Sequence, residues 1–315
     1  MKTTRRIAAF VAVAGLALAA CSAGATSSPT TAPSTAPSTA PSGQPSASAP
    51  ASEAPAVDPA SLLGKVLAAG KIVMSTDPQY PPQSSLKSDG TYEGFDIDVG
   101  NEIAKRLGVT LEYATPKWEV ITAGSWSGRW DFSVGSMTIT TPREKILAFS
   151  KPYYYTPAQL AASTVSGITT YDGMAGKTIC VGAATTYFDW LNGQLDLGSY
   201  TSLIKMEPPA GAKATTLDTD RLCAETIKAG RKEFEGWLSS STTVEQAIAD
   251  GLPLIKVGDP VYYEPLGVAF DKSGPDPTSM VEKVNQILDE MRADGTLKGF
   301  ADKWFGIDLT TAPGS

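Results

Sequence analysis

The spacing of apolar residues after position 58 predicts alternating strands and helices. The clearest helix covers 94–108, because Phe95, Val99 and Ile103 recur every four residues and Gly108 is suited to end it. Around it we expect a helix over 58–70, strands over 71–75 and 109–113, a helix over 119–126 and a strand over 132–137. Such alternation indicates parallel sheets with covering helices.

The alternation starts again in the second half of the chain. There we expect strands over 178–182, 203–206 and 233–238, and helices over 188–195, 218–229 and 244–250. The chain then returns through 262–270 to the first unit, and it ends in two helices, the second beginning near Thr296. Two α/β lobes joined by more than one crossing predict a hinge, with a ligand cleft at the carboxyl ends of the strands.

The N-terminus has the pattern of an export signal. Three basic residues precede an apolar run over 7–20, which is short for a membrane-spanning helix. Residues 18–21, Leu-Ala-Ala-Cys, resemble a bacterial lipobox, in which the cysteine sulfur takes the lipid. We therefore expect a lipoprotein signal peptide over 1–20 and a lipidated, palmitate-carrying Cys21. An ordinary secretory cleavage site is the alternative, and an arginine pair in the leader also allows twin-arginine export.

The lipidated cysteine opens a segment of very low complexity, 21–57. It consists mainly of Ser, Thr, Pro, Ala and Gly and contains the near-repeat TAPSTAPSTAPS. Such a composition cannot bury a core, so we predict a disordered tether. At about 3 Å per residue, a Pro-rich chain of this length reaches on the order of 100 Å. An anchor of this kind on the cell membrane suits a Gram-positive surface.

Net charge and residue usage exclude several functions. The chain carries a net charge of −7 and contains no histidine. An acidic chain is a poor nucleic-acid or anionic-lipid binder. The lack of histidine removes the usual zinc ligand and any mechanism that needs a Ser-His or Cys-His pair. We therefore expect no nucleic-acid partner, no metal and no catalytic residues. We also expect a monomer without a cofactor.

Two cysteines remain once Cys21 is assigned to the lipid. Cys180 lies in a strand-like run and Cys223 in a helical segment. In an exported protein such a pair predicts a disulfide, worth on the order of 4 kcal/mol for a loop of about 44 residues. Two separate buried thiols are the alternative.

The segment 131–155, DFSVGSMTITTPREKILAFSKPYYY, concentrates hydrogen-bond donors. A strand-like run ends in several hydroxyl residues, after which Pro142 and Arg143 open a short helix. Backbone N–H groups, hydroxyls and a guanidinium therefore converge at the end of a strand. This combination suits a small carboxylate.

The same segment resembles the ligand-binding core of the family 3 extracellular solute-binding proteins, the amino-acid receptors of ABC importers. The resemblance covers 61–308 through STDPQYPP, GFDIDVGNEIAKRLG, GSMTITTPRE, and FDKSG followed by EMRADGTLKGFADKWFG. It implies a two-lobed, periplasmic-binding-protein-like (type II) α/β fold with the ligand between the lobes. It places lobe 1 at 58–156 plus 259–308, lobe 2 at 157–258 and a tail at 309–315.

The resemblance also assigns ligand-binding residues. Arg143 would pair with a ligand carboxylate, and Ser136 and Thr138 would supply hydroxyl and N–H contacts to the same group. From the second lobe, Thr185 and Thr186 would close on the carboxylate.

Three further positions would contact the rest of the ligand. Tyr80 would pack on it, Trp118 would contact its side chain, and the Gly135 carbonyl would meet an ammonium group.

One position departs from the family pattern. The family places an aspartate for the ligand ammonium at the end of a strand, where this chain has Leu238 or Ser239. Either another acid, Glu235 or Asp189, replaces it, or the ligand lacks a free ammonium, since a buried cation without an anion is costly. From this we expect no clear preference for ligands with a free α-ammonium.

The resulting hypothesis is a lipid-anchored binding protein that closes by a hinge on a carboxylate-bearing solute and delivers it to an ABC permease. One alternative is a lyase similar to cyclohexadienyl dehydratase, which would need a cleft carboxylate as general acid or base. The other is a sensor ectodomain, which would need a following membrane helix, whereas the sequence stops at Ser315.

Overall fold

A computed structural model describes residues 57–314, so the predicted signal peptide, Cys21 and nearly all of the tether lie outside the described residues. The α-helices are α1 (Leu62–Ala69), α2 (Phe95–Leu107), α3 (Trp118–Thr122), α4 (Thr141–Glu144), α5 (Thr186–Leu191), α6 (Asp220–Lys228), α7 (Ser241–Ala249), α8 (Thr278–Ala293) and α9 (Thr296–Phe305). The 3-10 helices are η1 (Asp172–Met174) and η2 (Gly198–Leu203). The strands are β1 (Lys71–Ser75), β2 (Gln79–Tyr80), β3 (Ser84–Leu86), β4 (Tyr92–Glu93), β5 (Thr110–Ala114), β6 (Phe132–Thr138), β7 (Leu147–Phe149), β8 (Tyr154–Ser163), β9 (Thr178–Gly182), β10 (Lys213–Leu217), β11 (Gly236–Ser240) and β12 (Leu254–Asp271).

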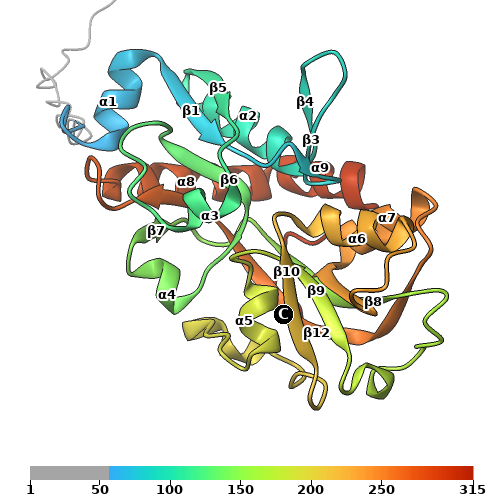
Figure 1. Ribbon diagram of the computed structural model, residues 1–315. Coiled ribbons are helices and arrows are strands. Elements are labelled where there is room, and N and C mark those ends of the chain that lie inside the picture. The colour runs from blue at the N-terminus through green and yellow to red at the C-terminus, as the bar shows by residue number, and fades with distance from the viewer. Residues whose placement is uncertain (1–56, 315) are drawn as a thin grey trace, which may run out of the picture. The chain divides into compact units, whose positions relative to one another are not determined.

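The main sheet contains two groups of parallel strands. Its order is β10-β9-β11-β8-β12-β6-β1-β5, with β7 paired to β12 (Figure 1). Strands β5, β1 and β6 are parallel to one another, and so are β10, β9 and β11. Between these groups, β8 and β12 pair in antiparallel fashion. The predicted α/β architecture with two parallel units is therefore confirmed.

The two central strands carry the chain from one parallel group to the other. β12 pairs with β8 over most of its length, and it pairs with β6 and β7 at its carboxyl end. The β8–β12 register shifts between Val257 and Tyr262, a local irregularity of the ladder. The exact lobe boundaries stay a prediction.

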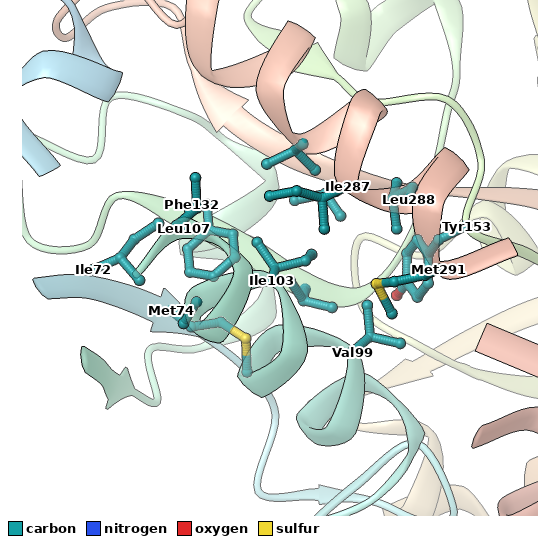
Figure 2. Close-up of a cluster of buried hydrophobic side chains, with 14 of the residues drawn as sticks. Ile72, Met74, Val99, Ile103, Leu107, Phe132, Tyr153, Ile287, Leu288 and Met291 are labelled. Atoms are coloured by element: carbon teal, nitrogen blue, oxygen red, sulfur yellow. The ribbon is translucent and has the colours of Figure 1, made fainter. Parts of the chain in front are cut away.

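The first group of strands is covered by α1, α2, α8 and α9. Phe95, Val99 and Ile103 of α2 are fully buried, and Gly108 ends the helix with φ of 74°, as the apolar spacing predicted. Figure 2 shows this face of α2 packed against side chains of β1, β6 and α8. Full burial of each such side chain contributes roughly 1.5–3 kcal/mol.

The second group of strands has separate apolar clusters. One contains Trp190 of α5 and Tyr262 of β12, and the other joins α6 and α7 to Trp237. Cys180 of β9 and Cys223 of α6 are joined by a disulfide within the latter cluster, with Cα atoms 5.7 Å apart. The predicted pairing is confirmed.

Most predicted elements are present, but two strands were placed wrongly. Residues 198–203 form η2 instead of leading into a strand over 203–206, and the strand in that region is β10. Only Ile204 keeps a single bridge, to Tyr262, because the apolar run is too short to form a ladder. The strand expected over 233–238 is β11, which begins at Gly236 and ends at Ser240.

Within residues 57–314, no helix combines the length and apolar composition needed to cross a membrane.

The double variant Cys180→Ala/Cys223→Ala is expected to lose about 4 kcal/mol of unfolding free energy, because the bridge joins residues 43 apart and restricts the unfolded chain. Urea unfolding followed by circular dichroism measures the difference. A reducing agent should lower the wild-type midpoint to a similar extent and leave the double variant unchanged. An unaltered midpoint in the double variant would contradict this account.

Candidate functional site

A cavity of about 50 Å³ lies where strand ends from both parallel groups meet. Its walls come from β6, from the carboxyl ends of β9 and β10, and from the loop after β1. The cavity is lined by Asp77, Tyr80, Trp118, Gly135, Ser136, Thr138, Arg143, Gly182, Ala183, Thr185, Thr186, Tyr187, Asp218, Thr219, Asp220 and Glu264. All eight predicted ligand-binding residues are among them, although their individual roles stay predictions.

Arg143 is held in place by the local fold of α4. Thr140 caps this helix by accepting from the Arg143 N–H, and proline occupies its first turn, as predicted. The guanidinium is almost fully buried and donates to the carbonyls of Thr138 at 3.0 Å and Ala184 at 2.9 Å. Burial lowers its pKa, while the nearby carboxylates of Asp189 and Glu264 act in the opposite direction.

The Ala184 carbonyl receives two donors from the opposite wall of the cavity. Besides Arg143, the Trp118 indole N–H donates to it at 3.2 Å, and the guanidinium lies 5.6 Å from the Trp118 ring centre. Ala184 has φ of 56°, a left-handed conformation that is uncommon for a residue with a side chain. This strained turn aims its carbonyl at both donors, and it follows β9, in the segment predicted to close over a carboxylate.

Ser136 is also left-handed, with φ of 53°, and its donors are used within the protein. Its N–H donates to the Tyr153 hydroxyl at 3.0 Å, and its Oγ donates to Asp96 at 2.7 Å and contacts the Tyr154 hydroxyl. Burial raises the pKa of Asp96 to about 7, and the hydrogen bonds from Tyr153 and Ser136 oppose the rise. Ser136 therefore lies at the predicted wall, with its hydrogen bonds directed to this network.

Glu264 is a buried acid that the sequence analysis did not single out. One carboxylate oxygen accepts from Thr138 at 2.9 Å and Thr186 at 3.1 Å, and the other accepts from Thr156 at 3.1 Å and Tyr187 at 2.8 Å. Burial raises its pKa, and these hydroxyls oppose the rise. Its position on β12, in an otherwise apolar returning segment, was the available signal.

Strand β11 continues to Ser240, one residue beyond Leu238 and Ser239, where the sequence predicted the missing acid. The Ser240 hydroxyl accepts from Tyr80 at 3.1 Å and from Gln83 at 3.2 Å. Burial raises the pKa of Tyr80, and Asp220 and Glu264 raise it further, so the phenol stays neutral. This end of β11 is therefore enclosed by neutral polar groups.

The acids suggested as replacements do not line the cavity. Glu235 accepts from the Thr178 N–H at 3.0 Å, and Asp189 lies on α5 outside the cavity wall. The lining carboxylates are those of Asp77, Asp218, Asp220 and Glu264.

Among the carboxylates that line the cavity, Asp220 is the most buried after Glu264. It begins α6 after the capping residue Thr219, is 8% exposed, and accepts from the Gly182 N–H at 2.8 Å. Burial raises its pKa to about 7; the Gly182 hydrogen bond opposes the rise and the Glu264 charge adds to it. Asp220 was not predicted as a site residue because β10 was not recognised, so the residues after β10 were not expected to follow a strand.

Together, the fold and the cavity define a two-lobed binding protein of the type II periplasmic class. Residues 72–307 match the family described as bacterial extracellular solute-binding proteins, family 3. The chain belongs to this family.

Named relatives are binding proteins for amino acids. The L-cystine-binding protein TcyJ of Escherichia coli is 29% identical over 259 residues, which cover 79% of this chain and 88% of TcyJ. The ABC transporter arginine-binding protein 1 of E. coli is 26% identical over 243 residues, which cover 76% of this chain and 92% of that protein. The fold is similar to the crystal structure of the ancestral amino acid-binding protein AncCDT-1, a precursor of cyclohexadienyl dehydratase, with a TM-score of 0.66. The two chains are 26% identical, and the match covers 78% of this chain and 100% of AncCDT-1.

Asp220→Asn is expected to stabilise the ligand-free protein at pH 8 by up to about 4 kcal/mol, because it removes a buried negative charge. The figure follows from about 1.36 kcal/mol for each unit by which the pKa of Asp220 in the folded protein exceeds that of a free aspartate. The folded pKa, about 7, lies above the ordinary aspartate value of 3.8, so the wild type loses stability as pH rises between these values. The advantage of the variant should therefore shrink toward pH 4. Urea unfolding at pH 4, 6 and 8 measures it.

Glu225→Gln on the same helix is the control, because Glu225 is paired with Arg221 at the surface. It should show no comparable gain on going from pH 4 to pH 8. An Asp220→Asn advantage that is independent of pH would contradict the buried-charge account.

Proposed function

We propose that this protein captures a small carboxylate-bearing solute, an amino acid or an amino-acid-like compound, and delivers it to an ABC permease. The observation that carries the proposal is the shared cavity, in which the buried Arg143 guanidinium lies among the other seven predicted residues. A buried guanidinium suits a carboxylate, which it can bind through two parallel hydrogen bonds. The names of the cystine-binding and arginine-binding relatives support the amino-acid class.

Ligand binding would be completed by hinge closure. The solute first meets the wall formed by Trp118 and Arg143, and the turn at Ala184 then closes from the other lobe. The ion pair between Lys117 and Asp218, at 2.9 Å, supports the same closed arrangement at the rim. Exclusion of water strengthens the contact with Arg143, and the permease recognises the closed form.

The cellular location in this proposal is inferred from the N-terminal segment. A lipid on Cys21 anchors the protein outside the cytoplasm, and the tether over 21–57 lets a monomeric binding unit move above the cell membrane. The family description as extracellular proteins supports the location.

The solute leaves chemically unchanged in this proposal. Incubation with prephenate tests the lyase alternative. Formation of a decarboxylated and dehydrated product would contradict the proposal that the solute is only bound. Recovery of the unaltered compound supports simple binding.

Arg143→Ala is expected to reduce affinity for the bound solute at least about 30-fold, because removal of one partner of a buried charged pair costs 2 kcal/mol or more. Isothermal titration calorimetry with the twenty standard amino acids and L-cystine first identifies a ligand and then measures the loss. Circular dichroism checks that the variant is folded.

Lys145→Ala provides the matched control, since Lys145 is exposed at the end of the same short helix and does not line the cavity. It should bind within a factor of about two of the wild type, as most exposed substitutions have small effects. Wild-type affinity in folded Arg143→Ala would overturn the carboxylate assignment.

A further inference from the structure

The four carboxylates of the cavity wall differ in the ion pairs and hydrogen bonds that they already make within the protein. Asp218 pairs with Lys117 at the rim, at 2.9 Å. Glu264 already accepts four hydroxyl hydrogen bonds, two on each oxygen. Asp77 is only partly buried and accepts from the Gln79 N–H at 2.8 Å. Asp220 is buried, faces the cavity, and has no salt-bridge partner within residues 57–314.

The chain is built to bring the Asp220 carboxylate close to the backbone of β9. A Cβ atom added at Gly182 would lie 2.9 Å from Asp220 Oδ1 and 3.1 Å from Thr185 Cγ2. Only glycine therefore allows the 2.8 Å hydrogen bond from the Gly182 N–H without movement of Asp220 or its neighbours. The N-terminus of α6, a helix of nine residues, also favours a negative charge at this point.

The alternative position for an acid, at the end of β11, is neutral and already occupied by protein contacts. Ser240 accepts from Tyr80 and Gln83, and it donates to Thr243 at 2.9 Å. Tyr80 lies close enough to Asp220 for that charge to raise its pKa. The Tyr80 side chain thus donates to the neutral strand end and lies near the carboxylate at the start of α6.

We propose that Asp220 binds the positively charged nitrogen of the ligand while Arg143 binds its carboxylate, so that the preferred ligands are zwitterions. This inference rests on the proposed function, because it assigns a second contact in the same cavity. Among the described residues, Arg143 is the one basic side chain on the cavity wall, so a cationic nitrogen would balance the excess of carboxylates. Asp220 thereby reverses the sequence-based expectation that a free ammonium would not be preferred.

The raised pKa of Asp220, about 7, supports this assignment, because an acid held partly protonated by burial ionises readily when a cation arrives. Charge-assisted hydrogen bonds of this kind are about twice as strong as neutral ones. The cost of burying the acid in the empty cavity is then offset when the ligand is bound.

The test uses calorimetric titration of the purified chain at pH 8 with L-arginine, L-cystine and the standard amino acids. For each amino acid that binds, the analogue lacking the α-amino group is titrated in parallel. We expect the wild type to bind the amino acid at least about 30-fold more tightly than its deaminated analogue. Asp220→Asn should lose a similar factor for the amino acid and bind the analogue at least as well as the wild type does.

Glu225→Gln, on the same helix and away from the cavity, is the matched control and should bind both compounds as the wild type does. Asp220→Ser removes the same charge with a smaller side chain and replaces Asp220→Asn if that variant does not fold. Each folded variant is verified by circular dichroism.

The outcomes separate this inference from the proposed function. If the wild type binds an amino acid and Arg143→Ala abolishes binding, but Asp220→Asn binds within about threefold of the wild type, the Asp220 assignment is wrong and the proposed function stands. For an amino acid whose only cationic group is its α-ammonium, equal affinity of the wild type for the amino acid and its deaminated analogue would overturn the zwitterion preference in the same way. If the wild type binds none of the amino acids or analogues, both proposals fail.

Discussion

The cavity depends on the pairing of β8 with β12, because these strands pass between two otherwise separate groups of parallel strands. Each group has its own apolar clusters and covering helices. Without the antiparallel pair, helix α4 with Arg143 and helix α6 with Asp220 would have no fixed relation to each other. The register shift between Val257 and Tyr262 interrupts the ladder next to Glu264. A small change of backbone geometry at such a shift would move one wall of the cavity against the other, which is the motion that the proposed hinge closure needs.

Two opposite charges lie at this junction, and hydrogen bonds to neutral groups compensate the burial of each. Arg143 donates to two carbonyls, and Glu264 accepts from four hydroxyls contributed by β6, β8 and α5. Burial of unpaired charges would be strongly unfavourable, and these contacts reduce the penalty while leaving the charges in place. Because the partners come from elements far apart in the sequence, the same network fixes the relative positions of the walls. Binding chemistry and fold stability are thus coupled at one place.

Local pattern predicted the parts of the site that depend on neighbours in sequence. The four-residue apolar spacing specified α2, and Pro142 with its preceding hydroxyl residues specified α4 and hence the place of Arg143. The family resemblance then supplied the eight positions that share the cavity. The missed residues depend on distant pairing instead. The sequence of β10 is Lys-Ala-Thr-Thr-Leu, in which no residue is buried and apolar residues show little periodicity. Its conformation as a strand therefore depends on the hydrogen-bonded ladder with β9. Asp220 fell within a predicted helix, but its place at the cavity could not be inferred until that strand was known.

The exchange of an acid at the end of β11 for an acid at the start of α6 changes more than the location of a charge. The side chain of Ser240 is fully buried, accepts hydrogen bonds from Tyr80 and Gln83, and does not line the cavity. At Asp220, the carboxylate faces the cavity, and the helix N-terminus stabilises it before a ligand arrives. The burial that raises the pKa of Asp220 also makes the empty protein less stable at neutral pH. A residue that lowers stability in the empty state and can recover it through a cation has the energetic character of a binding residue, because functional groups are the usual place where a fold tolerates such a penalty.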